Sequence, residues 1–429
     1  MRRGAAATMC LGAVLLTAYG CARKPESGTT QEPTTGGESL NGAAAGSERE
    51  GATPSADAPS PWGATRAEQC RQQPRPALSA KAEKTLDEGA RAAAKGDTAT
   101  AEASFQQTLK RDPNAYEALY DLGVLADRQG NERVAMDYYR RALGVLPDYE
   151  PAARGISTIL LRRGKVQEAL AVVEPLADAS RANLEMQALY AELLVEARRL
   201  EEAWLAARRA LKCDERFVPA LIALVKASQA QGRDELADSI LDQALQVDPD
   251  VAELHFLNGE RAKAEPGQQR EALAAYERAV QLRPDYAEAR MALGIQLLAS
   301  GNYATALSHF QAAAQLVPTL PAVHVDLGDA YRATRQWTEA EREYRRALEL
   351  QPKLPEAHYG LALLFLTSAG EIPGVDELAA YEKAVDELKT YRAQMGPRLA
   401  KGDQSEEYLR DLDRLIERAR RRVEREGGT

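Results

Sequence analysis

The sequence has little of what enzymes and metal proteins commonly use. Its 429 residues include only four cysteines and four histidines, and aromatic residues make up 6%. Such scattered cysteines and histidines exclude a disulfide-stapled scaffold and a zinc module. Positive charge is not in excess either, because 55 Lys and Arg face 64 Asp and Glu. The resulting net charge of −9 argues against a nucleic-acid partner.

Catalytic motifs are also missing. The sequence has no HExxH, CxxC or GxSxG, and Gly164-Lys165 lacks the spacing of a phosphate-binding loop. His255, His324 and His358 recur at one position of the repeat described below, where other repeats have leucine, so we expect them to pack between helices. The sequence therefore predicts no enzyme, no cofactor, no metal site and no small-molecule substrate.

The N-terminus has the pattern of a secretion signal. Arg2 and Arg3 precede an apolar stretch, residues 4–17, that is too short to span a bilayer comfortably. Small residues then precede Cys21, and residues 1–20 resemble a bacterial lipoprotein signal peptide, which implies that Cys21 is the lipid-attachment site. The pattern departs from that family because Ala18 replaces the usual leucine and the bulky Tyr19 follows. Ordinary signal peptidase would also accept it, and would leave a secreted protein.

Residues 21–77 predict a disordered tether. Pro, Gly, Ser and Thr dominate, and Leu40 and Trp62 are the only large apolar residues after Cys21. Such a segment buries too little apolar surface to offset its ordering entropy. A flexible coil of this length spans about 40 Å. Cys70 lies in this tether and Cys213 at a predicted helix end, so we expect two separate thiols, although an oxidising envelope would permit a disulfide.

Residues 78–391 repeat with a period of 34. Pro113 and Pro147 are separated by this period, and so are the prolines at 284, 318 and 352. Nine units then begin near residues 82, 116, 150, 184, 218, 252, 287, 321 and 355. The seventh unit begins one residue late because the segment at 265–269 carries an insertion.

Each unit has the pattern of a helical hairpin. The eighth residue is small in eight of the nine units, as at Gly123, and the twentieth is alanine in eight, as at Ala135. An aromatic residue such as Tyr139 often follows four positions later, and in several units a glycine such as Gly130 separates the two helices. This pattern resembles the tetratricopeptide repeat (TPR) family. The resemblance implies an all-α fold, a right-handed α-α superhelix of about nine TPR hairpins.

Residues 392–429 predict a loop and an amphipathic helix. The helix spans about 405–425, with Tyr408, Leu412 and Ile416 on its apolar face. Since a solenoid needs an end cap with one polar face, we expect the helix to cap the array. Two alternatives are that it folds into the inner groove, or that Arg418–Arg422 bind a partner or a lipid headgroup.

The TPR resemblance also implies a protein-binding groove. In that family, the second, fifth, ninth, twelfth and thirteenth residues of each first helix line the inner surface. The co-chaperone clamp for a C-terminal carboxylate is excluded, because the required asparagines are missing. The apolar third of the groove predicts an amphipathic helix or strand as its ligand. The residues carried over are Glu117, Tyr120, Arg128, Arg154, Glu192, Lys226, Phe256, Met291, Ile295, Leu298, Tyr359 and Leu363.

Together these patterns predict an envelope scaffold. Ala22, rather than an acidic residue, follows Cys21, which by resemblance to lipoprotein sorting implies the periplasmic face of the outer membrane. TPR lipoproteins of this layout serve gliding motility, secretin or pilus assembly, and outer-membrane protein assembly. The segments at 367–374 and 396–403, with the terminal helix, resemble the gliding-motility TPR lipoproteins. The alternatives are a periplasmic regulator of a cell-wall enzyme and an outer-membrane protein assembly factor.

Overall fold

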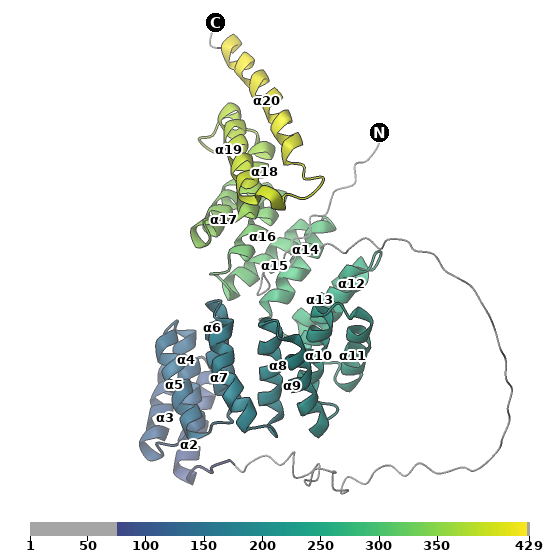
Figure 1. Cartoon of the computed structure of the whole chain (residues 1–429). Coiled ribbons are helices and arrows are strands. Elements are labelled where there is room, and N and C mark those ends of the chain that lie inside the picture. The colour runs from purple at the N-terminus through teal and green to yellow at the C-terminus, as the bar shows by residue number, and fades with distance from the viewer. Residues whose placement is uncertain (1–74, 427–429) are drawn as a thin grey trace, which may run out of the picture. The chain divides into compact units, whose positions relative to one another are not determined.

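The computed structural model describes residues 75–426, and within this range it contains helices and no strand (Figure 1). The predicted signal peptide, Cys21 and most of the predicted tether lie outside the described residues. The described chain forms two compact bodies, residues 75–240 and 241–426, with the boundary inside α11. In neither body is a helix long and apolar enough to cross a membrane.

The helices follow one another as hairpins. The first body contains α2 (Ala80–Ala94), α3 (Thr98–Arg111), α4 (Tyr116–Arg128), α5 (Glu132–Val145), α6 (Glu150–Arg162), α7 (Val166–Ala179), α8 (Leu184–Glu196), α9 (Leu200–Cys213), α10 (Val218–Ala230) and the start of α11 (Asp234–Val247). The second continues with α12 (Ala252–Ala264), α13 (Gln269–Leu282), α14 (Ala287–Ala299), α15 (Tyr303–Leu316), α16 (Pro321–Ala333), α17 (Trp337–Leu350), α18 (Pro355–Ser368), α19 (Glu377–Met395), the short 3-10 helix η1 (Gly396–Arg398) and α20 (Ser405–Glu426).

The repeat units predicted from the sequence coincide with these hairpins. From α4 to α18, every first helix begins at the residue predicted for its unit. The connecting turn requires a left-handed backbone, and Gly130 supplies it with φ 76°. In two hairpins an arginine takes the same place, Arg198 with φ 62° and Arg335 with φ 58°. The all-α hairpin-repeat prediction is confirmed.

Aromatic rings clamped between small residues hold successive hairpins together. A Cβ added at Gly123 would lie 2.5 Å from the Tyr139 ring, and one at Gly155 would lie 2.7 Å from it. The Tyr344 ring has the same two neighbours, Gly328 and Gly360. Each ring therefore contacts the first helix of its own hairpin and the first helix of the next one.

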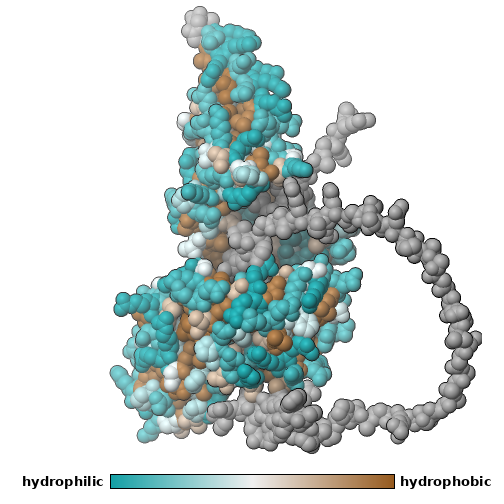
Figure 2. Space-filling model, in the orientation of Figure 1, coloured by the Kyte–Doolittle hydropathy of each residue, from teal (hydrophilic) through white to brown (hydrophobic). Residues whose placement is uncertain are grey.

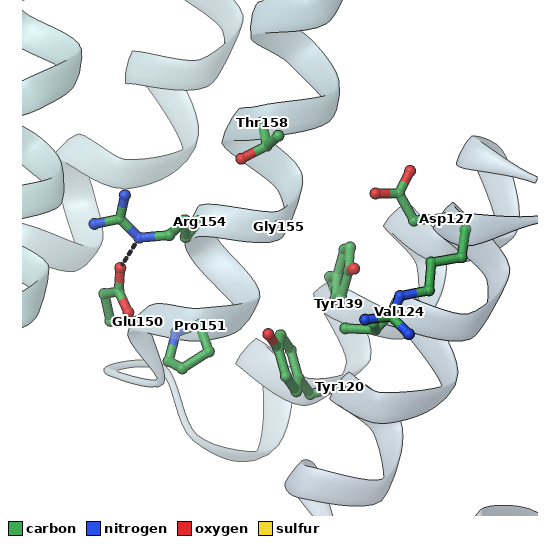
Figure 3. A pocket seen from close by; sticks show the side chains of 10 residues that line it. Tyr120, Val124, Asp127, Tyr139, Glu150, Pro151, Arg154, Gly155 and Thr158 are labelled. Atoms are coloured by element: carbon green, nitrogen blue, oxygen red, sulfur yellow. Dashed lines mark hydrogen bonds and ion pairs between the residues drawn. The ribbon is translucent and has the colours of Figure 1, made fainter. Parts of the chain in front are cut away.

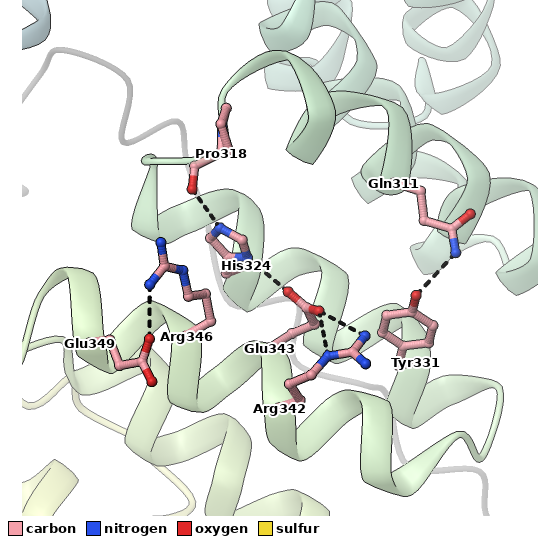
Figure 4. Close-up of polar contacts among 8 residues, drawn as sticks. All are labelled: Gln311, Pro318, His324, Tyr331, Arg342, Glu343, Arg346 and Glu349. Atoms are coloured by element: carbon pink, nitrogen blue, oxygen red, sulfur yellow. Dashed lines mark hydrogen bonds and ion pairs between the residues drawn. The ribbon is translucent and has the colours of Figure 1, made fainter. Parts of the chain in front are cut away.

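Histidine and arginine side chains hydrogen-bond to the turns between hairpins, as His324 does in Figure 4. His255 and His324 each place Nε2 near the carbonyl of the proline six residues earlier, at 2.7 and 3.0 Å. Arg290 donates to the carbonyl of Pro284 in the same way, at 2.6 Å. The second nitrogen of His324 lies 2.8 Å from Glu343. The packing role expected for these histidines thus includes a hydrogen bond to the preceding turn.

The terminal helix packs on the last hairpin. On α20, Leu412 and Ala419 are buried, and Ile416 is partly buried against the same core. The principal neighbour of α20 is α19, to which Arg420 donates a 2.8 Å hydrogen bond at Glu382. Val423 remains 58% exposed, and hydrophobic surface runs along this helix at the top of Figure 2. The helix therefore covers the end of the array at α19.

Cys213 departs from the sequence prediction. It ends α9 and is disulfide-bonded. It is the one cysteine in the range 75–426, so its partner lies outside the described residues. The expectation that Cys213 is a separate thiol is wrong, because a half-buried cysteine at the end of a helix can be reached by a chain segment that helix periodicity does not place.

Candidate functional site

A pocket of about 470 Å³ lies in the first body, between α4, α5 and α6 (Figure 3). Its volume is within the range of sites that hold a side chain or a small ligand. On α4, Tyr120, Val124 and Arg128 succeed one another at four-residue spacing and so share one face of the helix. The complete lining is Tyr120, Val124, Asp127, Arg128, Tyr139, Glu150, Pro151, Arg154, Gly155 and Thr158.

Two tyrosines form one wall of the pocket. The ring centroids of Tyr120 and Tyr139 are 5.7 Å apart, opposite Pro151 and Arg154 on α6 (Figure 3). Tyr139 is only 2% exposed, yet its hydroxyl has no hydrogen-bond partner in the part of the chain that the structure describes. Burial, followed by the charge of Asp127, raises the pKa of Tyr139. The phenol is therefore a neutral donor at physiological pH.

Most charges around the pocket are already paired. Arg154 donates to Glu150 and, at 2.9 Å, to Glu192. Burial alone would lower the pKa of Arg154, but these two carboxylates outweigh burial and raise it. Asp127 pairs with Arg162. Both acidic residues of the lining are thus held by guanidinium groups.

Arg128 is the exception among the lining residues. Its side chain is exposed, and it makes no ion pair or hydrogen bond within residues 75–426. Its charge nevertheless acts on the phenols of Tyr120 and Tyr139, whose pKa values it lowers in part. The pocket therefore combines an unpaired cation with an unsatisfied hydroxyl donor.

In two hairpins of the second body, the tyrosine at the position of Tyr139 is hydrogen-bonded to a carboxylate of the first helix. In α12 and α13, Tyr276 donates to Glu260 at 2.6 Å, and Lys263 pairs with the same carboxylate at 2.7 Å. In α16 and α17, Tyr344 donates to Asp329 at 2.7 Å, and Arg332 pairs with it at 3.2 Å. Each tyrosine, carboxylate and base forms a triad. In the first body, Val124 occupies the place of the carboxylate and Asp127 occupies the place of the base.

The structure brings together part of the predicted groove. Tyr120, Arg128 and Arg154 line the pocket, and Glu192 joins it through Arg154. Glu117 lies one turn before Asp121, and one of its carboxylate oxygens is buried without a partner in the described chain.

The remaining charged and aromatic residues predicted for the groove, Lys226 and Phe256, lie on α10 and α12 and not at the pocket. Lys226 lies close enough to Glu196 to offset part of the rise in its pKa that burial causes. Phe256 packs against the rings of Tyr276 and Tyr286, at 6.0 and 5.3 Å.

The apolar predictions in the second body are engaged in packing. Met291 is buried, while Ile295 and Leu298 are half-buried against the core. The Tyr359 ring lies 5.0 Å from that of Tyr391. Leu363 is half-buried on α18.

Tyr139 was not predicted as a site residue, because its position in the repeat indicates the interior of the hairpin. The sequence did contain a signal for this residue. Tyrosine recurs at this position in several hairpins. In two of these hairpins the ninth residue of the repeat unit is acidic, whereas in the hairpin of Tyr139 it is Val124. Only the structure shows that these positions, 15 residues apart, meet. No group of His, Cys, Asp and Glu within residues 75–426 has the arrangement of a metal site.

These features define a helical-repeat protein with a side-chain-sized pocket between α4, α5 and α6. Family models described as tetratricopeptide repeat match residues 86–151, 155–216, 261–321 and 297–364. The chain belongs to this family, a class of repeat scaffolds for protein–protein interaction, and the matches include no catalytic family. No curated protein matches the chain.

The chain is similar to several solved structures. A chain of the APC/C hetero-tetramer Cut9-Hcn1 has 17% identity over 78% of this chain and 77% of that chain, with a TM-score of 0.45. YrrB, described as a TPR protein with an unusual peptide-binding site, has 22% identity over 43% of this chain and 95% of its own chain, with a TM-score of 0.33. MamA from Desulfovibrio magneticus RS-1 has 20% identity over 41% of this chain and 96% of its own chain, with a TM-score of 0.36.

Proposed function

We propose that the chain is a scaffold of the bacterial envelope that binds segments of other proteins in its α4–α6 pocket. The observation that carries the binding role is the Tyr139 hydroxyl, which has no hydrogen-bond partner among residues 75–426 and lines the same pocket as the unpaired Arg128. A polar group in such a pocket can fix the orientation of a ligand, so this donor favours a ligand that supplies the acceptor. YrrB, a TPR protein with a peptide-binding site, is a precedent for this role.

Two observations support an envelope location. Residues 1–21 have the order of a lipoprotein signal, with Cys21 as the acylated residue. The disulfide at Cys213 favours an oxidising compartment, because cytosolic thiols are kept reduced. In this proposal the acylated Cys21 anchors the protein on the periplasmic face of the outer membrane, and the scaffold serves a gliding-motility machine or a secretin or pilus assembly.

The test compares the wild-type protein with Cys21→Ser. Cells are labelled with radioactive palmitate, membranes are fractionated, and neighbours are crosslinked and identified by mass spectrometry. We expect both the label and the outer-membrane fraction to disappear in the variant. A protein that is unlabelled and not membrane-associated in both strains would overturn the anchor, and the crosslinked neighbours decide between the two machines.

A further inference from the structure

The α4–α6 pocket has the tyrosine of a triad without the carboxylate that accepts from it. In the complete triads, the carboxylates of Glu260 and Asp329 accept a hydrogen bond from a tyrosine of the second helix. The same carboxylates pair with a base three residues later on the first helix. Each of these tyrosines and bases is thereby paired with a carboxylate of its own hairpin.

In the first body the tyrosine remains, Val124 stands in place of the acid, and Asp127 stands in place of the base, with Arg128 one residue later. Tyr139 lies 15 residues after Val124, the same separation as between Asp329 and Tyr344. Arg128 lies four residues after Val124, on the same face of α4. The space beside Val124 is part of the pocket.

From this we propose that the pocket binds a carboxylate of a partner protein, which accepts from the Tyr139 hydroxyl and pairs with Arg128. The ligand then completes the triad from outside. The neighbouring acids do not oppose it strongly, since Asp127 is paired with Arg162 and Glu150 with Arg154. This inference deepens the proposed function and rests on it, because it names the chemistry of the partner segment.

The shape of the pocket favours an acidic side chain within a peptide. Pro151, Val124 and the ring of Tyr120 provide apolar walls beside the polar groups. An Asp or Glu side chain presents a short apolar stem and a carboxylate to such walls. A free C-terminus offers the same carboxylate chemistry, so the experiment must separate the two sources.

The test uses purified full-length protein on arrays of short peptides with randomised flanks. One set is C-terminally amidated and carries Glu, Asp, Gln or Lys at its centre, and a second set carries a central Gln and a free C-terminal carboxylate. We expect the amidated Glu and Asp peptides to bind about 10-fold or more tightly than the Gln peptides, as a charge-assisted hydrogen bond would give. Selective binding of the second set would overturn the side-chain source and retain the carboxylate.

Three variants assign the binding to the pocket. Tyr139→Phe removes only the hydroxyl, Arg128→Gln removes only the charge, and Val124→Asp supplies the missing acid from the chain itself. Each should abolish the preference for acidic peptides. Tyr276→Phe, which removes the matching hydroxyl in a complete triad, and Arg140→Gln, on an exposed part of α5, should leave it unchanged.

Two results would overturn the inference. One is equal binding of acidic and amide peptides. The other is an acid preference that survives in Tyr139→Phe and Arg128→Gln, since both variants retain the pocket walls. If the proposed function is wrong, the result is different: the wild-type chain would crosslink to no envelope protein. Partners that crosslink equally to wild type and Tyr139→Phe would refute this inference and leave the scaffold role intact.

Discussion

At Gly123, a single hydrogen atom in place of a methyl group decides how closely two helices approach. The Tyr139 ring fills the space above it, so that a Cβ would lie 2.5 Å from the ring edge. Gly144, on α5, has no heavy atom within 4 Å of the same hypothetical Cβ. The two glycines therefore differ in packing, although both lie in helices.

We expect Gly123→Ala and Gly144→Ala to change stability in opposite directions. The first should destabilise by about 1–3 kcal/mol, because the added methyl overpacks against Tyr139. The second should stabilise by about 0.5–1 kcal/mol, because alanine loses less conformational entropy in a helix than glycine does. Urea unfolding midpoints of the two variants provide the comparison, and a stabilising Gly123→Ala would contradict the packing described.

Asp121 gives the first body a pH-dependent stability. Burial, and then the charge of Glu117, raises the pKa of Asp121 to about 6, and this carboxyl has no ion pair or hydrogen bond among residues 75–426. The folded state therefore binds this proton more tightly than the unfolded state, whose pKa is about 4. Its contribution to stability is present below pH 4 and is lost as the pH rises through 6.

Asp121→Asn should remove this loss. Relative to wild type, the variant should gain roughly 1–3 kcal/mol between pH 4 and pH 8, as two pKa units imply. Urea unfolding at several pH values measures the difference, and Asp137→Asn on the exposed side of α5 is the control. A difference that does not change with pH would show that Asp121 titrates normally in the folded state.

For the helices, the sequence predicted the boundaries well because each repeat contains residues that end a helix. Prolines and glycines mark where helices stop, so the beginnings of α4 to α18 could be read directly. The connection between α18 and α19 is longer than in the other hairpins, and the glycines and proline of residues 367–374 indicate it in the sequence. The site was only partly predictable, because the family positions indicate which residues face inward but not which of them find partners. Arg128 and Arg154 look alike in the sequence, yet Arg154 is doubly paired and Arg128 is not.

The terminal helix provides a test at this scale. Leu412 is fully buried between α20 and α19, whereas Val423 on the same helix is 58% exposed. Leu412→Ala should destabilise the docking of α20 by about 2–5 kcal/mol, and Val423→Ala should change it by no more than about 0.5 kcal/mol.

Hydrogen exchange of the α19 and α20 peptides, followed by mass spectrometry, measures this docking. Faster exchange in Leu412→Ala alone would support the cap. Equal exchange in both variants would mean that α20 does not depend on its contact with α19.

For the whole molecule, the cysteines link the fold to its compartment. Four are present, and Cys213 is disulfide-bonded. In the proposed mature protein, Cys10 is removed with the signal peptide and Cys21 carries lipid. Cys70 is then the remaining partner for Cys213.

Peptide mapping of the unreduced protein should therefore find a peptide containing Cys70 joined to one containing Cys213. Reduction should release both, and Cys213→Ser should leave Cys70 reactive toward a thiol reagent. A Cys21–Cys213 linkage would instead show that Cys21 is not acylated, and would refute the lipid anchor.

The clamped rings also limit how this chain can change length during evolution. Removing residues 150–183 would preserve the 34-residue period and every helix boundary after it. It would nevertheless place Leu189 where Gly155 now contacts Tyr139, and a leucine cannot occupy the space that only a hydrogen fills. Hairpins with the same outline are therefore not interchangeable, and the order in which they follow one another is itself an inherited property of the protein.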